Sequence, residues 1–195
     1  MNVPNKLTVS RFDLTFFFLA AVFSNAPYEE TIALLLFSAA GLTDYLDGKI
    51  ARRDKLITNF GILMDPLADK ILICSAFIAF VGRGWMPAWM VVIIVARELA
   101  ITGLRLLGVS KNLVLAAESF GKYKTIAQIV AAISILVLHS YSQWGCFGRT
   151  LFGFPAGHSW IGVVAQISMY LATILTFTSG ALYLWRNRRL YLADL

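Results

Sequence analysis

Four aspartates in one short stretch have the spacing needed to bind divalent metal ions. The stretch "DYLDGKIARRDKLITNFGILMDPLAD" contains the pairs Asp44 and Asp47, then Asp65 and Asp69. On a helix, positions three or four apart lie on one face, so each pair would present both carboxylates to one side. If the two faces meet, four anions converge and need a counter-charge. All-oxygen ligands suit magnesium, manganese or calcium, and two such ions about 3.5–4 Å apart are a common device for phosphoryl-group displacement.

Two glycines accompany these aspartates on the same predicted faces. Gly48 directly follows Asp47, and Gly61 lies one turn before Asp65. A glycine inside a helix costs up to about 1 kcal/mol relative to alanine, so its presence needs a reason. The glycines either let a flat, bulky ligand lie against the backbone or serve as small residues at a helix–helix contact. The neighbouring carboxylates favour the ligand.

The aspartates also have other interpretations when taken one or two at a time. Asp65 precedes Pro66 and could cap a helix that begins there. A single pair of aspartates within a span could relay protons or cations. Asp54, in "ARRDK", is interpreted as a loop charge near arginines. None of these interpretations accounts for four carboxylates together.

A second cluster of charged residues follows in "ARELAITGLRLLGVSKNLVLAAESFGKYKT". Arg97 and Arg105 are eight positions apart and close to one helix face, and Lys122 and Lys124 come shortly after them. Arginine can bind a phosphate with two parallel hydrogen bonds, so these four cations would form a cradle for a phosphate-bearing ligand. Glu98 is expected to pair with a cation or to orient an arginine. Cytoplasmic loop charge is the alternative for the lysines, but it does not suit arginines within an apolar helix.

The segments that must position these residues are strongly apolar. Of the 195 residues, 58% are hydrophobic and 14% are charged, and the mean hydropathy is +0.71. Soluble domains have about a quarter charged residues, and a helix needs about 20 residues to cross the hydrocarbon of a bilayer. We therefore predict an all-α polytopic membrane protein forming a single domain over residues 1–195. A short interfacial helix is expected before six transmembrane helices at about 13–28, 31–52, 61–82, 86–108, 122–141 and 159–185.

The basic residues indicate how these spans are oriented. With six spans, both termini share one side with two of the connections, and that side carries Lys6, Arg11, Arg52, Arg53, Lys55, Lys111, Lys122, Lys124, Arg186, Arg188 and Arg189. The opposite side carries Arg83 and Arg149. Basic residues favour the cytoplasmic side, so both termini are predicted to be cytoplasmic, with Lys6 and Arg11 among the head groups. Attraction to anionic lipid explains the basic surface without a nucleic-acid partner.

Nine charged residues fall within or at the edges of the second, third and fourth predicted spans: Asp44, Asp47, Lys49, Asp65, Asp69, Lys70, Arg97, Glu98 and Arg105. A charge at the bilayer centre costs roughly 2.5–3.5 kcal/mol, so nine facing lipid would cost on the order of 20 kcal/mol. Whole domains are stable by only about 5–15 kcal/mol. These groups must therefore face one another, water or a ligand, and we predict a polar cavity that opens to the cytoplasm.

The first stretch, written D-x2-D-G-x2-A-R-x8-G-x3-D-x3-D, resembles the signature of the CDP-alcohol phosphotransferase family. Its fixed positions are filled, without a departure in spacing, by Asp44, Asp47, Gly48, Ala51, Arg52, Gly61, Asp65 and Asp69. The segments "NVPNKLTVSR", "ARE" with "TGLR", and "GKYKT" resemble the branch that uses CDP-diacylglycerol and glycerol 3-phosphate. The segment "SYSQWGCFGRTLFGFPAGHSW" has no counterpart in this resemblance.

The resemblance implies a role for each matching residue. Asp44, Asp47 and Asp65 would bind two divalent ions, Mg²⁺ or Mn²⁺, and Asp69 would bind one of them and act as general base. The CDP portion would contact Gly48, Arg52 and Gly61. The acceptor phosphate would be held by Arg97, Arg105, Lys122 and Lys124, with Thr8, Arg11 and Thr125. The resemblance also implies a homodimer in the bacterial inner membrane, with a cytoplasmic site that transfers a phosphatidyl group and releases CMP.

Three other functions fit part of the pattern. A sister enzyme would use another acceptor, such as inositol phosphate, serine or a second phospholipid, and the four cations favour a phosphorylated one. A small divalent-cation transporter also needs buried carboxylates, but it does not need the glycines and more often contains repeats. A structural membrane subunit is disfavoured by the cost of the in-span charges.

Overall fold

The structure of the chain is a computed structural model that describes residues 3–54, 59–110, 120–152, 159–188 and 190. It describes the side chains of residues 10–43, 70–108, 123–148, 150–152, 159–188 and 190. Apart from short turns these ranges are helical, and they contain no β-strand, which confirms the predicted all-α class. The elements are α1 (Val3–Val22), α2 (Glu29–Asp54), α3 (Asn59–Gly82), α4 (Ala88–Ser110), α5 (Phe120–Ser140), the short 3₁₀ helix η1 (Tyr141–Trp144), α6 (Gly145–Phe152) and α7 (Trp160–Arg186).

The N-terminal helix differs from the expected pair of helices. Residues predicted to form a short interfacial helix are continuous with the following apolar run in α1, which ends at Val22 rather than at residue 28. Pro4 lies in the first turn, where proline is tolerated, and no glycine or proline interrupts the helix after it. Asn25 and Tyr28 have positive φ angles of 50° and 63°, and the chain reverses there before α2 begins.

Two stretches of helix among the described residues are long and apolar enough to cross a membrane. One is Tyr123–Gly148, which covers most of α5, all of η1 and the start of α6, and the other is Trp160–Arg186, which is α7. Large apolar side chains on several helices also face outward, among them Phe16, Leu99 and Phe177. Exposed apolar surface of this extent is typical of contact with lipid or a partner. Composition and helices together support membrane association.

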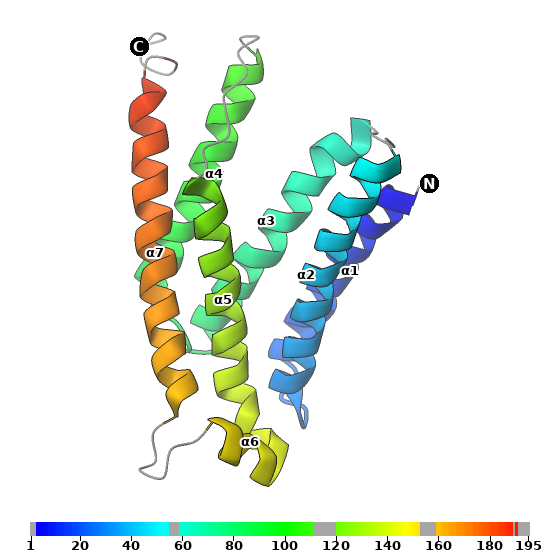
Figure 1. The fold of residues 1–195 in the computed structure, drawn as a ribbon, viewed down its shortest axis with the longest axis vertical. Helices are drawn as coiled ribbons and strands as arrows, with labels where there is room; N and C mark the ends of the chain where they lie inside the picture. The colour runs from blue at the N-terminus through cyan, green and yellow to red at the C-terminus, as the bar shows by residue number, and fades with distance from the viewer. Residues whose placement is uncertain (1–2, 55–58, 111–119, 153–158, 189, 191–195) are drawn as a thin grey trace.

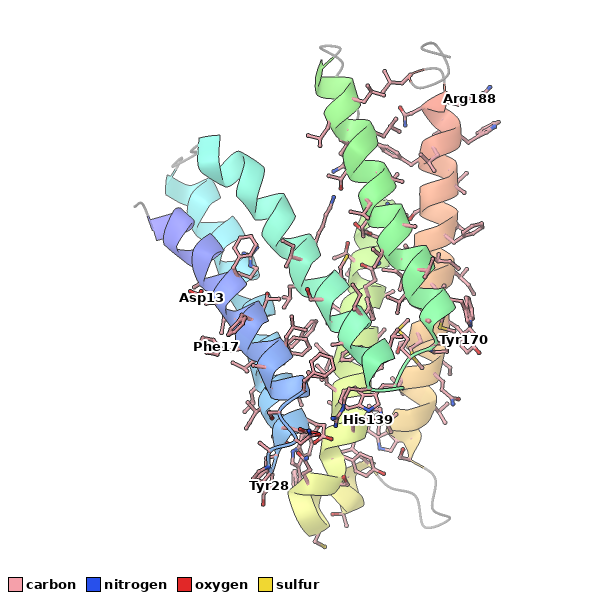
Figure 2. The ribbon with its side chains drawn as sticks, turned by 180° about the vertical axis from the view of Figure 1, so that it is seen from behind. Asp13, Phe17, Tyr28, His139, Tyr170 and Arg188 are labelled. Atoms are coloured by element: carbon pink, nitrogen blue, oxygen red, sulfur yellow. The ribbon has the colours of Figure 1, made fainter. Side chains whose placement is uncertain are left out.

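The helices run alternately up and down, so that the elements carrying the predicted site share one end of the molecule. We call this end the α2–α3 end. The first residues of α1, α3 and α5 and the last residues of α2, α4 and α7 lie toward it (Figure 1). The opposite end, which we call the α6 end, holds the turn between α3 and α4 together with η1 and α6 (Figure 1). Figure 2 shows Tyr28 and His139 near the α6 end and Arg188 at the other.

Two groups of helices make up the bundle. α1, α2 and α3 form one group, and α4 and α5 each pack against α7 in the other. Contacts of α5 with α2 and α3, and of α4 with α3, join the two groups (Figure 1). Many buried positions are alanines, including Ala131, Ala132, Ala165 and Ala172 where α5 meets α7. Small residues let helix backbones approach closely in a membrane, and side-chain hydrogen bonds then link them. Ser134 and Ser168 are 2.9 Å apart between their hydroxyl oxygens in this interface.

A polar network holds the α6 end together. Arg83 donates from Nη2 to Glu29 Oε1 at 2.5 Å, and Gln143 donates to Glu30. Thr31 donates to Gln143 at 2.7 Å, which ties α2 to η1. The α3–α4 turn that carries Arg83 has Gly84 at φ +72°, with Trp85 N bonded to Phe80 O and Gly84 N to Val81 O. That pattern is a Schellman cap, in which glycine avoids the cost of a positive φ.

Candidate active site

The four aspartates lie on two helix segments that come together at the α2–α3 end. Asp44 and Asp47 belong to the C-terminal half of α2, and Asp65 and Asp69 to the N-terminal half of α3 (Figure 1). Because α3 begins at Asn59, Asp65 lies inside the helix, and the interpretation of Asp65 as the cap of a helix beginning at Pro66 is wrong. The helical backbone supplies the periodicity that each pair needs to share a face.

The side chains of these aspartates lie outside the described part of the chain, so the meeting of their carboxylates stays a prediction. The same holds for Gly48, Arg52, Gly61, Thr8 and Lys122. Among the side chains that the structure describes, no group of three or more His, Cys, Asp or Glu could hold a metal ion. The donor set of four carboxylates on adjoining helical segments fits divalent cations, which prefer oxygen ligands.

Glu98 is the centre of the described part of the site. Its side chain is buried, and Oε1 accepts from Lys124 Nζ on α5 and from Arg97 Nη1 on α4, the latter at 3.3 Å. The ion pair with Lys124 joins residues 26 positions apart in the sequence. The prediction that Glu98 pairs with a cation is confirmed, and two of the four cations predicted to bind phosphate meet at this one carboxylate.

Lys70 brings a third cation to the same place, and the sequence had suggested no role for it. Its ammonium group donates to Thr102 Oγ1, and Thr102 in turn donates to the backbone carbonyl of Glu98 at 2.7 Å. A small cavity of about 20 Å³, room for roughly one water, is lined by Lys70, Ile73, Cys74, Glu98, Lys124, Thr125 and Gln128. The only sequence signal for Lys70 was a charge inside a span directly after Asp69.

Arg97 and Arg105 share the face of α4 that packs against α7. Arg97 Nη2 donates to Ser179 Oγ at 3.4 Å, and the Arg105 guanidinium lies 5.9 Å from the ring centre of Tyr183. Arg105 is exposed, and its described contact goes to α7 rather than to Glu98. The predicted common face of the two arginines is therefore confirmed, but among the described contacts Arg97 alone of the two joins the Glu98 cluster.

Arg11 is buried rather than placed among lipid head groups. Its exposed fraction is 1%, so the head-group expectation is wrong. Within the part of α1 whose side chains are described, the buried residues are Arg11, Thr15, Phe18 and Val22, which follow one another at helical spacing. Thr15 donates to the Arg11 carbonyl at 2.8 Å. An arginine on the inner face of a helix is consistent with the predicted polar interior of the bundle.

Gly180 on α7 makes room for the Arg97 side chain. A methyl group at this position would lie 2.6 Å from Arg97 Cγ. We expect Gly180→Ala to lower the stability of the protein by about 1–3 kcal/mol, the usual cost of overpacking. Thermal unfolding in detergent would measure the change as a lower Tm.

Gly103→Ala is the matched control, because a methyl group on Gly103 would meet nothing within 4 Å. This variant should be as stable as the unmodified chain, or up to about 1 kcal/mol more stable through helix propensity. Equal Tm values for the two variants would show that Arg97 is not seated against α7.

The fold, the apolar surface and the buried charges define a helical membrane-associated protein with a polar site between its helices. The chain belongs to the CDP-alcohol phosphatidyltransferase family, whose model matches residues 1–178. It is 36% identical over 198 residues to the CDP-diacylglycerol–glycerol-3-phosphate 3-phosphatidyltransferase of Bacillus subtilis (strain 168), covering 95% of each chain. A relative of the same name from Rickettsia bellii (strain RML369-C) is 31% identical, with 93% of each chain covered. The probable phosphatidylglycerophosphate synthase of Mycobacterium tuberculosis (strain ATCC 25618 / H37Rv) is 35% identical over 96% of this chain and 82% of its own.

Proposed function

We propose that the protein transfers the phosphatidyl group of CDP-diacylglycerol to sn-glycerol 3-phosphate, giving phosphatidylglycerophosphate and CMP. The observation that carries this proposal is the gathering of Lys70, Arg97 and Lys124 around Glu98 on helices that also carry the aspartate motif or adjoin it. Two of these cations bond to the Glu98 carboxylate and the third bonds to Thr102 one turn along α4, so basic donors gather at one place, which suits a phosphorylated acceptor. Relatives that match nearly the whole chain bear the name of this reaction.

The donor half of the reaction depends on the motif in α2 and α3. Asp44, Asp47, Asp65 and Asp69 would hold two Mg²⁺ or Mn²⁺ ions, whose charge offsets that of the diphosphate as CMP leaves. Gly48 and Gly61 would let the CDP portion approach the backbone, and Arg52 would pair with it. These roles follow from the resemblance and from the helical placement of the motif.

The acceptor half depends on the basic residues. Arg97, Arg105, Lys122 and Lys124, with Thr8, Arg11 and Thr125, would hold the phosphate of glycerol 3-phosphate and so fix its free hydroxyl. Asp69 would take the proton of that hydroxyl. The hydroxyl oxygen then bonds to the phosphorus that carries the diacylglycerol, and the bond from this phosphorus to the CMP oxygen breaks.

The membrane arrangement is part of the same proposal. Six spans, with both termini and the site on the cytoplasmic face of a bacterial inner membrane, agree with the alternating helices and with the shared α2–α3 end. An apolar groove of about 360 Å³ between α4 and α7, with Arg97 in its wall, is of the kind that would accommodate acyl chains of the lipid substrate. We further propose that the chain forms one domain over residues 1–195 and assembles as a homodimer.

An acceptor panel tests the proposal. Purified protein with CDP-diacylglycerol and Mg²⁺ or Mn²⁺ should release CMP when glycerol 3-phosphate is added, and phosphatidylglycerophosphate should appear in equal amount. Inositol phosphate, serine and a second phospholipid are the comparison acceptors. Release with one of these and none with glycerol 3-phosphate would assign the chain to a sister activity. No CMP release with any acceptor would leave the transporter as the better explanation.

A further inference from the structure

We propose that Glu98 is a positioning residue that holds Lys124 and Arg97 where the acceptor's phosphate binds. This inference rests on the proposed function and adds to it a residue that does not itself touch substrate. Glu98 is a carboxylate among cations, so its charge is opposite to that of a residue that would bind phosphate directly. Its effect on the reaction must therefore pass through the cations it contacts.

Burial makes this contact strong and specific. Glu98 is 5% exposed and Lys124 is 6% exposed, so water screens their ion pair little. Removing the Glu98 charge would take a charged partner away from a buried ammonium group, which is costly, so Lys124 would shift from its present position. The contact also fixes geometry, because the carboxylate is held on α4 while Lys124 comes from α5.

The cavity beside the ion pair has room for about one water, so a phosphate would contact these groups from the edge of the cavity. Lys70, Lys124 and Thr125 line it together with Glu98. An ammonium group has three donors, so Lys124 can contact a carboxylate and a phosphate oxygen at the same time. Thr102 links Lys70 to the backbone of Glu98, so one turn of α4 sets the positions of cations from three helices.

A competing role makes the opposite prediction. If Glu98 merely neutralised the cations, the phosphate would have to displace it, and removing its charge would strengthen acceptor binding. If Glu98 positions the cations, removing its charge lets them move and weakens acceptor binding. The direction of the change in KM for glycerol 3-phosphate therefore separates the two roles.

The experiment compares Glu98→Gln and Glu98→Asp with the unmodified protein in full kinetics of CMP release. For Glu98→Gln we expect KM for glycerol 3-phosphate to rise at least tenfold, with KM for CDP-diacylglycerol within about twofold and a smaller change in kcat. Glu98→Asp keeps the charge and should recover part of the loss. An unchanged or lower KM for glycerol 3-phosphate in Glu98→Gln would overturn the inference.

Glu29→Gln is the matched control, since Glu29 is also a buried ion-paired carboxylate but lies at the α6 end, bonded to Arg83. It should lower Tm without altering KM for glycerol 3-phosphate. If Glu98→Gln, like Glu29→Gln, only lowers the fraction of folded protein and leaves KM for glycerol 3-phosphate unchanged, the role of Glu98 is structural and the inference fails. If the unmodified protein releases no CMP with glycerol 3-phosphate, the proposed function fails and the inference falls with it.

Discussion

Replacing Asp69 by asparagine should lower the rate of CMP release by about 10²–10⁴-fold, the contribution usual for a general base. Asparagine has nearly the same size as aspartate, but it cannot take the proton of the attacking hydroxyl, and its neutral amide is a weaker metal ligand. The loss should appear in kcat at saturating CDP-diacylglycerol, glycerol 3-phosphate and metal. Single-turnover CMP release would measure it directly.

Asp54→Asn is the control for this variant, because Asp54 belongs to the same charged stretch but is the last residue of α2 and has no proposed part in the reaction. Asp54→Asn should retain the activity of the unmodified protein. The Tm of Asp69→Asn and of Asp54→Asn should equal that of the unmodified protein. Full turnover by Asp69→Asn would exclude Asp69 as the base and would move the search to another carboxylate of the motif.

Removal of divalent ions should abolish the reaction reversibly. A chelator leaves the aspartates without counter-charge and the diphosphate without charge neutralisation, so CMP release should fall to the background rate. Addition of Mg²⁺ or Mn²⁺ in excess of the chelator should restore it. Binding of Mn²⁺ followed by electron paramagnetic resonance should show two ions per chain.

Asp65→Asn provides the second measurement for the metal prediction. This variant should bind fewer than two Mn²⁺ ions per chain, or bind them more weakly, while its far-ultraviolet circular dichroism remains helical. Undiminished CMP release in the presence of a chelator, or unchanged Mn²⁺ binding by Asp65→Asn, would show that the four carboxylates serve another purpose.

Several features of the site follow from helical periodicity and needed no tertiary structure. Glu98 was expected to pair with a cation because a charge in an apolar helix requires one, and it does. The common face of Arg97 and Arg105 followed from their spacing. The head-group position expected for Arg11 was wrong, although Thr15, Phe18 and Val22 follow it at helical spacing on the buried face. Because a boundary between two helices was expected near residue 13, the spacing from Arg11 to Val22 was not considered as one helical face.

Other features are invisible in the sequence because periodicity orients a residue about its own helix axis without naming the neighbouring helix. Lys124 could have faced any of several helices, and its contact with Glu98 depends on how α4 and α5 each pack against α7 and α3. Lys70 reaches Thr102 for the same reason. Side-chain volume determines which helices can approach closely. Gly180 leaves room for Arg97 between α7 and α4, and small alanines let α5 and α7 come close together.

The sequence by itself determined the all-α class, the apolar runs, a spacing of four aspartates that suits metal ions, and the need to compensate nine charges within or beside apolar runs. Local spacing and transfer free energy suffice for these conclusions, since both depend on neighbours in the chain. Only the tertiary structure decided which charges meet: one buried carboxylate, Glu98, joins cations from two helices, and a threonine on its own helix draws in a third. Such contacts join residues far apart in sequence, and the fit of whole helices against one another determines them.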